Sequence, residues 1–214
     1  MQSSPQTIPS LQPRVFQYSL DWRFLLPISD PGQIYVLFEP DAEFSQTLAH
    51  VGIPVSNQLS LSDFRQGKGR DAQALVFPFG LSLRWVGANP VEQTAFFASA
   101  RNWMTSGGHL LVGFNHPWNR RARLAGKYHS VTPHRVEKQL QQVGYSSIKL
   151  FGAMPNLQIP EYIFDIDPRT IHFALHNRFR RKPAVLRGLR LLAGTIGPAR
   201  LSNLLPCYFA VATV

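Results

Sequence analysis

The alternation of apolar and polar positions predicts strands and helices in turn along most of the chain. Residues 33–38, QIYVLF, are apolar at successive positions, which is typical of a strand covered on both faces in a parallel sheet. Residues 42–52, AEFSQTLAHVG, carry apolar residues on one helical face and end in glycine. A second short strand is expected at residues 53–55, IPV, and a third at residues 72–80, AQALVFPFG.

Two further helices have clear start and stop signals. Residues 89–105 begin with an asparagine N-cap, a proline at the first helical position and a glutamate three residues after the cap. The Ser-Gly-Gly that follows is expected to end this helix before a fourth strand at residues 109–114. Residues 132–144 begin with Thr-Pro and end in glycine, and a strand is expected at residues 145–152.

This order of elements indicates an α/β protein. Strands that alternate with helices are the mark of a doubly wound parallel sheet with helices on both faces. Residues 160–177 predict an extended piece and a short helix, and residues 206–214 a last strand. A hairpin of the last two strands would complete a Rossmann-like, mixed seven-stranded sheet. Residues 1–13, polar with three prolines, are interpreted as a flexible leader, and residues 14–214 as a single domain.

Positive charge is concentrated in the second half of the chain. The net charge is +10, and residues 110–214 hold fifteen Lys and Arg against four Asp and Glu, a net of +11. Such a field suits an acidic protein partner, which we rank first, then an anionic membrane surface, then nucleic acid. A hetero-oligomer is one arrangement that this predicts.

The single cysteine and the hydropathy pattern favour a cytoplasmic protein. Cys207 has no second cysteine for an internal disulfide, and it lies in an apolar run typical of a buried residue. No stretch approaches the roughly 18 apolar residues of a membrane span. We therefore expect a cytoplasmic location, with peripheral contact to a membrane left open.

Three segments follow one another in a distinctive order: a strand and loop at residues 71–85, a helix, Gly-Gly turn and strand at residues 89–119, and a helix and strand at residues 132–156. In this order and spacing, the chain from about residue 20 to its end resembles the class I S-adenosylmethionine-dependent methyltransferases. Residues 71–85 are similar to that family's fourth strand and the loop after it, residues 89–119 to the segment before its fifth strand, and residues 132–156 to the helix and strand that follow. The resemblance implies the same mixed sheet and an S-adenosylmethionine site beyond the end of the first strand.

The cofactor motif implied by this resemblance is degenerate. Aligning the first strand places Phe38, Pro40 and Ala42 at three positions where the family has glycines. Phenylalanine adds bulk, proline fixes φ and removes an N–H donor, and alanine reaches a positive φ less readily than glycine. Glu39 and Asp41 could offer the cofactor new partners, or they could stabilise the start of the following helix.

Two other elements of the cofactor cleft also depart from the family. The acid that normally ends the second strand is replaced by Asn57 or Gln58, and an amide binds a hydroxyl without the strength of a charged acceptor. Phe77-Pro78-Phe79 stands where polar or acidic residues often precede the acceptor. We therefore expect no cofactor, although degenerate contacts from Glu39, Asp41, Asn57 and Phe79 stay open.

Two segments carry candidate acceptor-binding or partner-binding residues. The loop after the strand at 109–114 holds four of these residues, and the stretch after residue 177 holds two: Asn115, Trp118, Arg120 and Arg121, then Arg180 and Arg181. Polar and aromatic groups at such a strand end lie where open α/β sheets place ligands. His172 and His176 share a helical spacing, but no glutamate or third ligand accompanies them, so no metal is expected.

Two hypotheses follow. The first is a non-catalytic methyltransferase-like protein that binds or stabilises a partner, an enzyme of the same pathway, through its basic C-terminal half. The alternative is an active S-adenosylmethionine-dependent methyltransferase with an atypical cofactor loop and a small or glycan-like acceptor. In that case His116 is the expected general base, because an imidazole is suited to removing a hydroxyl proton near neutral pH.

Overall fold

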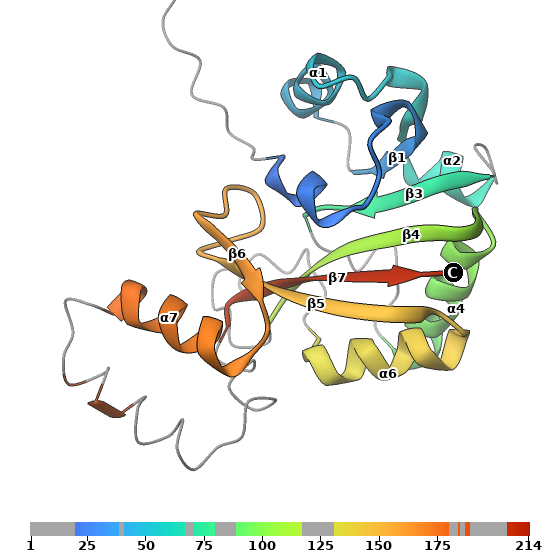
Figure 1. The fold of residues 1–214 in the computed structure, drawn as a ribbon. Coiled ribbons are helices and arrows are strands. Elements are labelled where there is room, and N and C mark those ends of the chain that lie inside the picture. The colour runs from blue at the N-terminus through green and yellow to red at the C-terminus, as the bar shows by residue number, and fades with distance from the viewer. Residues whose placement is uncertain are drawn as a thin grey trace, which may run out of the picture.

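The protein is an α/β molecule built on one seven-stranded mixed sheet (Figure 1). The computed structural model describes residues 20–38, 41–66, 71–79, 89–116, 131–179, 184, 187–188 and 205–214. The strands are β1 (Ile34–Leu37), β2 (Gln58–Leu59), β3 (Ala72–Phe77), β4 (Met104–Asn115), β5 (Ser146–Met154), β6 (Tyr162–Asp165) and β7 (Cys207–Thr213). The helices are α1 (Ala42–His50), α2 (Leu61–Arg65), α4 (Pro90–Arg101), α6 (Pro133–Val143) and α7 (Pro168–Phe179), with 3₁₀ turns η1 (Asp21–Leu25), η2 (Pro31–Gln33) and η3 (Val55–Asn57).

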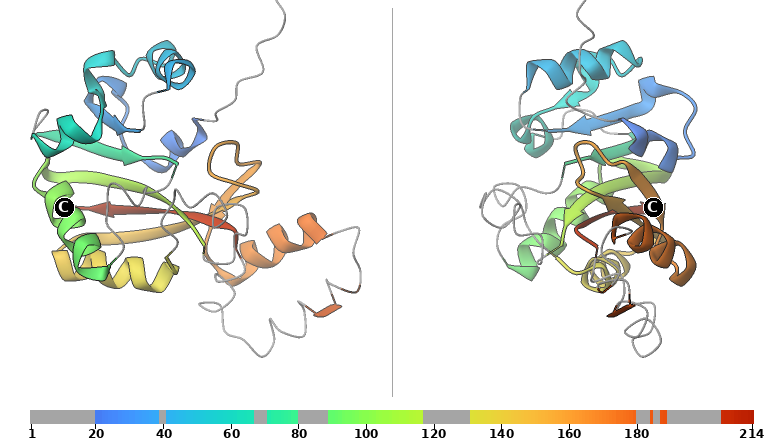
Figure 2. Two further views of the ribbon diagram at one scale, coloured as in Figure 1. Left: turned by 180° about the vertical axis from the view of Figure 1, so that it is seen from behind. Right: turned by 90° about the vertical axis from the view of Figure 1, so that its left-hand side faces the viewer.

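The strand order confirms the predicted Rossmann-like fold class. The sheet runs β2-β1-β3-β4-β7-β5-β6, and its first three neighbouring pairs are parallel. The last strand, β7, is inserted between β4 and β5 and is antiparallel to both. The expected hairpin of the last two strands is wrong, because β6 pairs with β5 and not with β7. Figures 1 and 2 show α7 beyond the end of the sheet opposite to the C terminus.

Both faces of the sheet are buried, as the continuous apolar strands predict. Along β3, Leu75 and Phe77 join one core cluster and Ala74 and Val76 the other, because successive side chains point to opposite faces. Helices α2, α4 and α6 cover the first face, while η1 and α1 cover the second.

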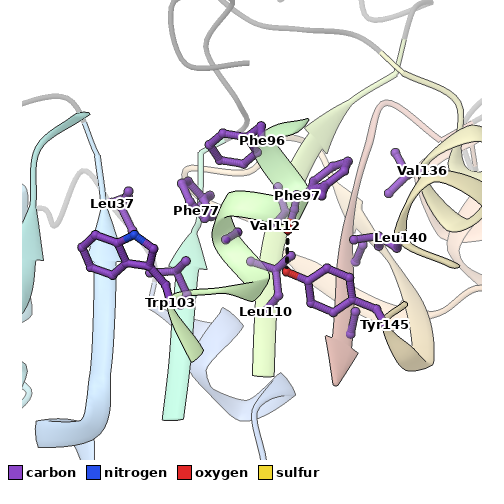
Figure 3. Close-up of a cluster of buried hydrophobic side chains, with 14 of the residues drawn as sticks. Leu37, Phe77, Phe96, Phe97, Trp103, Leu110, Val112, Val136, Leu140 and Tyr145 are labelled. Carbon is purple, nitrogen blue, oxygen red and sulfur yellow. Dashed lines mark hydrogen bonds between the residues drawn. The ribbon is translucent and has the colours of Figure 1, made fainter. Parts of the chain in front are cut away.

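The first face is held by aromatic packing and by buried hydroxyl groups. Phe96 of α4 packs on Phe77 of β3, with ring centroids 5.0 Å apart, and Phe97 on Phe114 of β4 at 6.4 Å. Figure 3 labels Phe77, Phe96 and Phe97 in this cluster. The Tyr145 hydroxyl donates to the Phe97 carbonyl at 3.1 Å, and burial raises its pKa. This bond ties the end of α6 to α4.

The cap signals of the two predicted helices are confirmed except at Thr132, which is the N-cap of α6 by position but makes no side-chain hydrogen bond to the helix. The Asn89 side chain accepts from the Glu92 N–H at 2.8 Å, and the Glu92 carboxylate reaches back to the Asn89 N–H. Gly144 ends α6 in the left-handed region, at φ 90°.

Two predicted boundaries are wrong. Residues 53–55 are not a strand: Val55 is exposed in the turn η3, which the Asn57 N–H closes on the Pro54 carbonyl, and β2 starts three residues later. The helix expected to reach residue 105 ends at Arg101, and the Ser-Gly-Gly sequence lies inside β4, which already begins at Met104. Gly107 has a φ of 79°, which allows the strand to bulge where its register against β3 shifts.

Candidate functional site

The strand order fixes where a ligand would be expected. From β1 the chain crosses to β2 on one side and then returns to β3 on the other. Open α/β sheets bind ligands at this switch point, outside the carboxyl ends of the strands. Phe38 follows β1 directly, and Phe79 lies two residues beyond the end of β3. The candidate site is therefore flanked by two aromatic side chains.

These two rings meet on a third ring, which is fully buried. Phe44 of α1 lies 4.9 Å from Phe38 and 4.5 Å from Phe79 between ring centroids, both in edge-to-face arrangements. The exposed fraction of Phe44 is 0%, and both of its partners pack against the core cluster beneath it. We call Phe38, Phe44 and Phe79 the aromatic trio. It brings apolar groups from both sides of the switch point into contact.

Asp41, which lies between Phe38 and Phe44 in the sequence, caps helix α1. The Asp41 carboxylate accepts the N–H groups of Glu43 and Phe44, each at 3.0 Å, as the N-cap of α1. An aspartate at this position stabilises both the unpaired N–H groups and the helix dipole. Ala42 is the first residue of the helix, and Glu39 and Pro40 lie outside the described residues.

The two amides considered for the end of the second strand lie elsewhere. Asn57 precedes β2, is buried, and donates to the carbonyls of Gly32 at 2.7 Å and Ile34 at 3.3 Å. Gln58, the first residue of β2, accepts the Ser45 hydroxyl and donates to the Ser45 carbonyl at 3.2 Å. Asn57 thus links η3 to η2 and β1, and Gln58 links β2 to α1.

Sequence reasoning missed the polar group that does follow β2. The Ser60 hydroxyl lies 2.7 Å from that of Ser62 and donates to the Asp63 carboxylate at 2.6 Å. Ser60 and Asp63 form the capping box of α2. The Ser-x-x-Asp spacing was the available signal, although it indicates a helix start and no particular ligand.

The residues at the end of β4 are buried. Asn115 pairs with Cys207 of β7, and the His116 N–H donates to the Pro206 carbonyl at 2.9 Å. The exposed fractions are 7% for Asn115 and 1% for His116, so both side chains lie inside the protein. The role of His116 as general base stays a prediction. It would require a substrate hydroxyl to reach the buried imidazole.

The remaining candidate residues fall outside the part of the chain that the structure describes. Trp118, Arg120, Arg121, Arg180 and Arg181 lie outside the described residues, as does the His172 side chain. Among the residues that the structure describes, no three His, Cys, Asp or Glu side chains gather as metal ligands. Within the same part of the chain, no helix is both long and apolar enough to cross a membrane.

Comparison with known proteins finds partial similarity to solved structures only. No family model and no curated protein matches the sequence. A methyltransferase from Archaeoglobus fulgidus aligns with a TM-score of 0.48 and 8% identity, over 85% of each chain. One from Thermotoga maritima aligns at 0.43 and 9%, over 89% of this chain and 84% of its own. A cyclopropane synthase from Mycobacterium tuberculosis aligns at 0.31 and 16%, over 70% of this chain and 57% of its own.

The similar structures include S-adenosylmethionine-dependent methyltransferases. The strand order of the chain itself defines the fold class.

Proposed function

We propose that the chain is a non-catalytic methyltransferase-like protein that binds or stabilises a partner through its basic C-terminal half. The observation that carries the proposal is the aromatic trio at the switch point. Edge-to-face pairs add about 0.5–1.5 kcal/mol each beyond burial, so opening this region would cost stability. An adenosyl ligand needs both space and hydrogen-bond partners at that place.

The polar contacts near the trio support the same proposal. Asp41 holds the first N–H groups of α1, which are the donors that a helix N-terminus offers to an anionic ligand. Asn57 and Gln58 bind backbone carbonyls inside the protein. A cofactor would have to displace the aspartate and find its ribose contacts elsewhere.

The partner is proposed to be an acidic protein, an enzyme of the same pathway. The net charge of +11 over residues 110–214 supplies the complementary field. Arg120, Arg121, Arg180 and Arg181 are the side chains proposed to meet it. A partner bound by such residues should dissociate more readily as the salt concentration rises.

Cofactor binding is tested by calorimetric titration of the isolated chain with S-adenosylmethionine and with S-adenosylhomocysteine. We expect no binding with a micromolar dissociation constant. A Phe38→Ala/Phe79→Ala variant tests whether the two rings alone block the site, and Phe24→Ala is the matched control because Phe24 is 82% exposed. Micromolar binding by the unchanged chain would favour the active methyltransferase instead.

Partner binding is tested separately by co-purification of the full chain at two salt concentrations. We expect Arg180→Gln/Arg181→Gln to release an acidic partner, while Arg65→Gln/Arg101→Gln, which changes charge equally in the first half, retains it. Equal retention by both variants would argue against the basic half as the binding surface.

A further inference from the structure

Helix α6 has an exposed polar face on the side away from the sheet. Its inner residues Val136 and Leu140 are fully buried, and Gln139 donates to the Pro90 carbonyl and to the Gln93 side chain of α4. Figure 1 shows α6 along the outside of the sheet, next to α4. The exposed side chains of the helix are those of His134, Arg135, Lys138, Gln141 and Gln142.

The helical spacing joins these side chains into one basic surface. Residues three or four positions apart are neighbours on a helix, so Lys138 lies beside Arg135 in one direction and beside Gln141 in the other. Glu137 is the one acid of the helix and is half-buried. It is one or two positions from the two cations, and residues at that spacing do not face each other. The exposed face of α6 is therefore basic.

The charges at the start of α6 oppose the helix dipole. A helix N-terminus is partially positive, so acids stabilise it and cations destabilise it. In α6 the first turn has no acid and contains Arg135, and the N-cap Thr132 makes no side-chain hydrogen bond. Such a local conflict is expected at functional surfaces. The helices α1, α2, α4 and α7 instead each have a carboxylate at this end, from Asp41, Asp63, Glu92 and Asp167.

The chemistry of this face favours a segment of an acidic protein. The stretch from His134 to Gln142 is about 12 Å long, at 1.5 Å per residue. None of its exposed residues is apolar, whereas a helix that enters a membrane surface needs an apolar face. Its two permanent cations are few for a duplex, whose binding proteins contact roughly 6–10 phosphates. An arginine, however, can hold one carboxylate through two parallel hydrogen bonds, and glutamine amides can donate beside it.

We propose that the outer face of α6 binds an acidic segment of the partner protein. Arg135 and Lys138 pair with carboxylates of that segment, and Gln141 and Gln142 donate hydrogen bonds beside them. A carboxylate bound at Arg135 also relieves the unfavourable charge at the start of the helix. This inference rests on the proposed function, because it names a part of the basic half that the partner contacts.

The test is calorimetric titration of the full chain at low ionic strength with a synthetic helical peptide that has one Glu on each successive turn of one face. We expect the peptide to bind, and to bind Arg135→Gln/Lys138→Gln roughly two- to thirty-fold more weakly, as the loss of two exposed charge pairs predicts. Lys149→Gln/Arg169→Gln, which removes two exposed cations of the same half on β5 and α7, is the matched control and should bind normally.

A second measurement separates binding from a purely solvated role of Arg135. Arg135→Glu places an acid in the first turn of α6, so the urea midpoint of the free chain should rise. The same variant should no longer bind the acidic peptide. A gain in stability without a loss of binding would overturn the proposal, because the cation would then serve no partner.

Co-purification keeps this inference apart from the proposed function. If Arg180→Gln/Arg181→Gln releases the partner and Arg135→Gln/Lys138→Gln retains it, the proposed function stands and the role of α6 is wrong. The proposal would also be overturned by no binding at millimolar peptide, by equal binding of a peptide with Gln in place of every Glu, or by an unchanged affinity of the α6 variant. Binding of phosphatidylserine vesicles through α6, without binding of the peptide, would overturn it as well.

Discussion

Phe44 is the residue on which the aromatic trio depends, because it contacts both other rings and is fully buried. We expect Phe44→Ala to lower the free energy of unfolding by about 3–5 kcal/mol, since it removes a large core side chain and leaves a cavity. Urea denaturation measures the change. Phe24→Ala, at a position 82% exposed, should stay within about 0.5 kcal/mol of the unchanged chain. A small loss at Phe44 would mean that the trio is loosely packed.

The sequence could indicate that Phe38 replaces a small residue, but not what the ring contacts. The partners of Phe38 come from a helix and from the segment beyond another strand, and such contacts are set by tertiary packing. Asn57 shows the same limit, because its bonds to Gly32 and Ile34 join residues far apart in the chain. Asp41 could be read correctly as a cap, because a cap bonds only to its near neighbours.

At the scale of single elements, the N-terminus of α4 makes a sharp prediction. Asn89→Ala removes the acceptor of the Glu92 N–H, and we expect it to destabilise the protein by about 0.5–2 kcal/mol. Asn89→Asp keeps an acceptor in place and is the matched control. If both variants unfold at the same denaturant concentration as the unchanged chain, this capping box contributes nothing measurable.

The same local character explains which elements could be predicted. Helices α4 and α6 are bounded by caps that lie within a few residues, and both were predictable. The strand β2 was not, because its two residues pair with Val36 and Leu37, and nothing local distinguishes them from Ile53 to Val55. The bulge at Gly107 depends on the register of β4 against β3, which a turn-like Ser-Gly-Gly sequence conceals.

At the scale of the whole molecule, the insertion of β7 between β4 and β5 joins the two parts of the sheet. Its successive residues Tyr208 and Phe209 enter opposite core clusters, so the last strand of the chain joins the two cores. The Tyr208 hydroxyl donates to the Val131 carbonyl at 2.9 Å, and burial raises its pKa well above the usual value. The sequence could supply β7 as a strand, but not its position between β4 and β5, since pairing between distant strands leaves no local signal.

The pH dependence of stability tests the pairing of β4 with β7, because His109 of β4 lies against Thr213 at the end of β7. Its Nδ1 is 3.1 Å from the Thr213 hydroxyl oxygen, and burial lowers the pKa of the imidazole below its usual 6.5. The unfolded chain therefore binds a proton at a higher pH than the folded one. Stability should be independent of this group above neutral pH and should fall as the pH drops through about 6.5 toward the lowered value.

Urea denaturation between pH 8 and 5 measures this effect. We expect His109→Gln to flatten the decline in that window, whereas His134→Gln, at an exposed position on α6, should leave it unchanged. The hydrogen bond from the Thr170 hydroxyl lowers the pKa of Asp167, so the contribution of that carboxylate is lost only below its ordinary range near 3.8, in a separate window. If the unchanged chain and His109→Gln lose stability in parallel as the pH falls, protonation of His109 does not oppose folding.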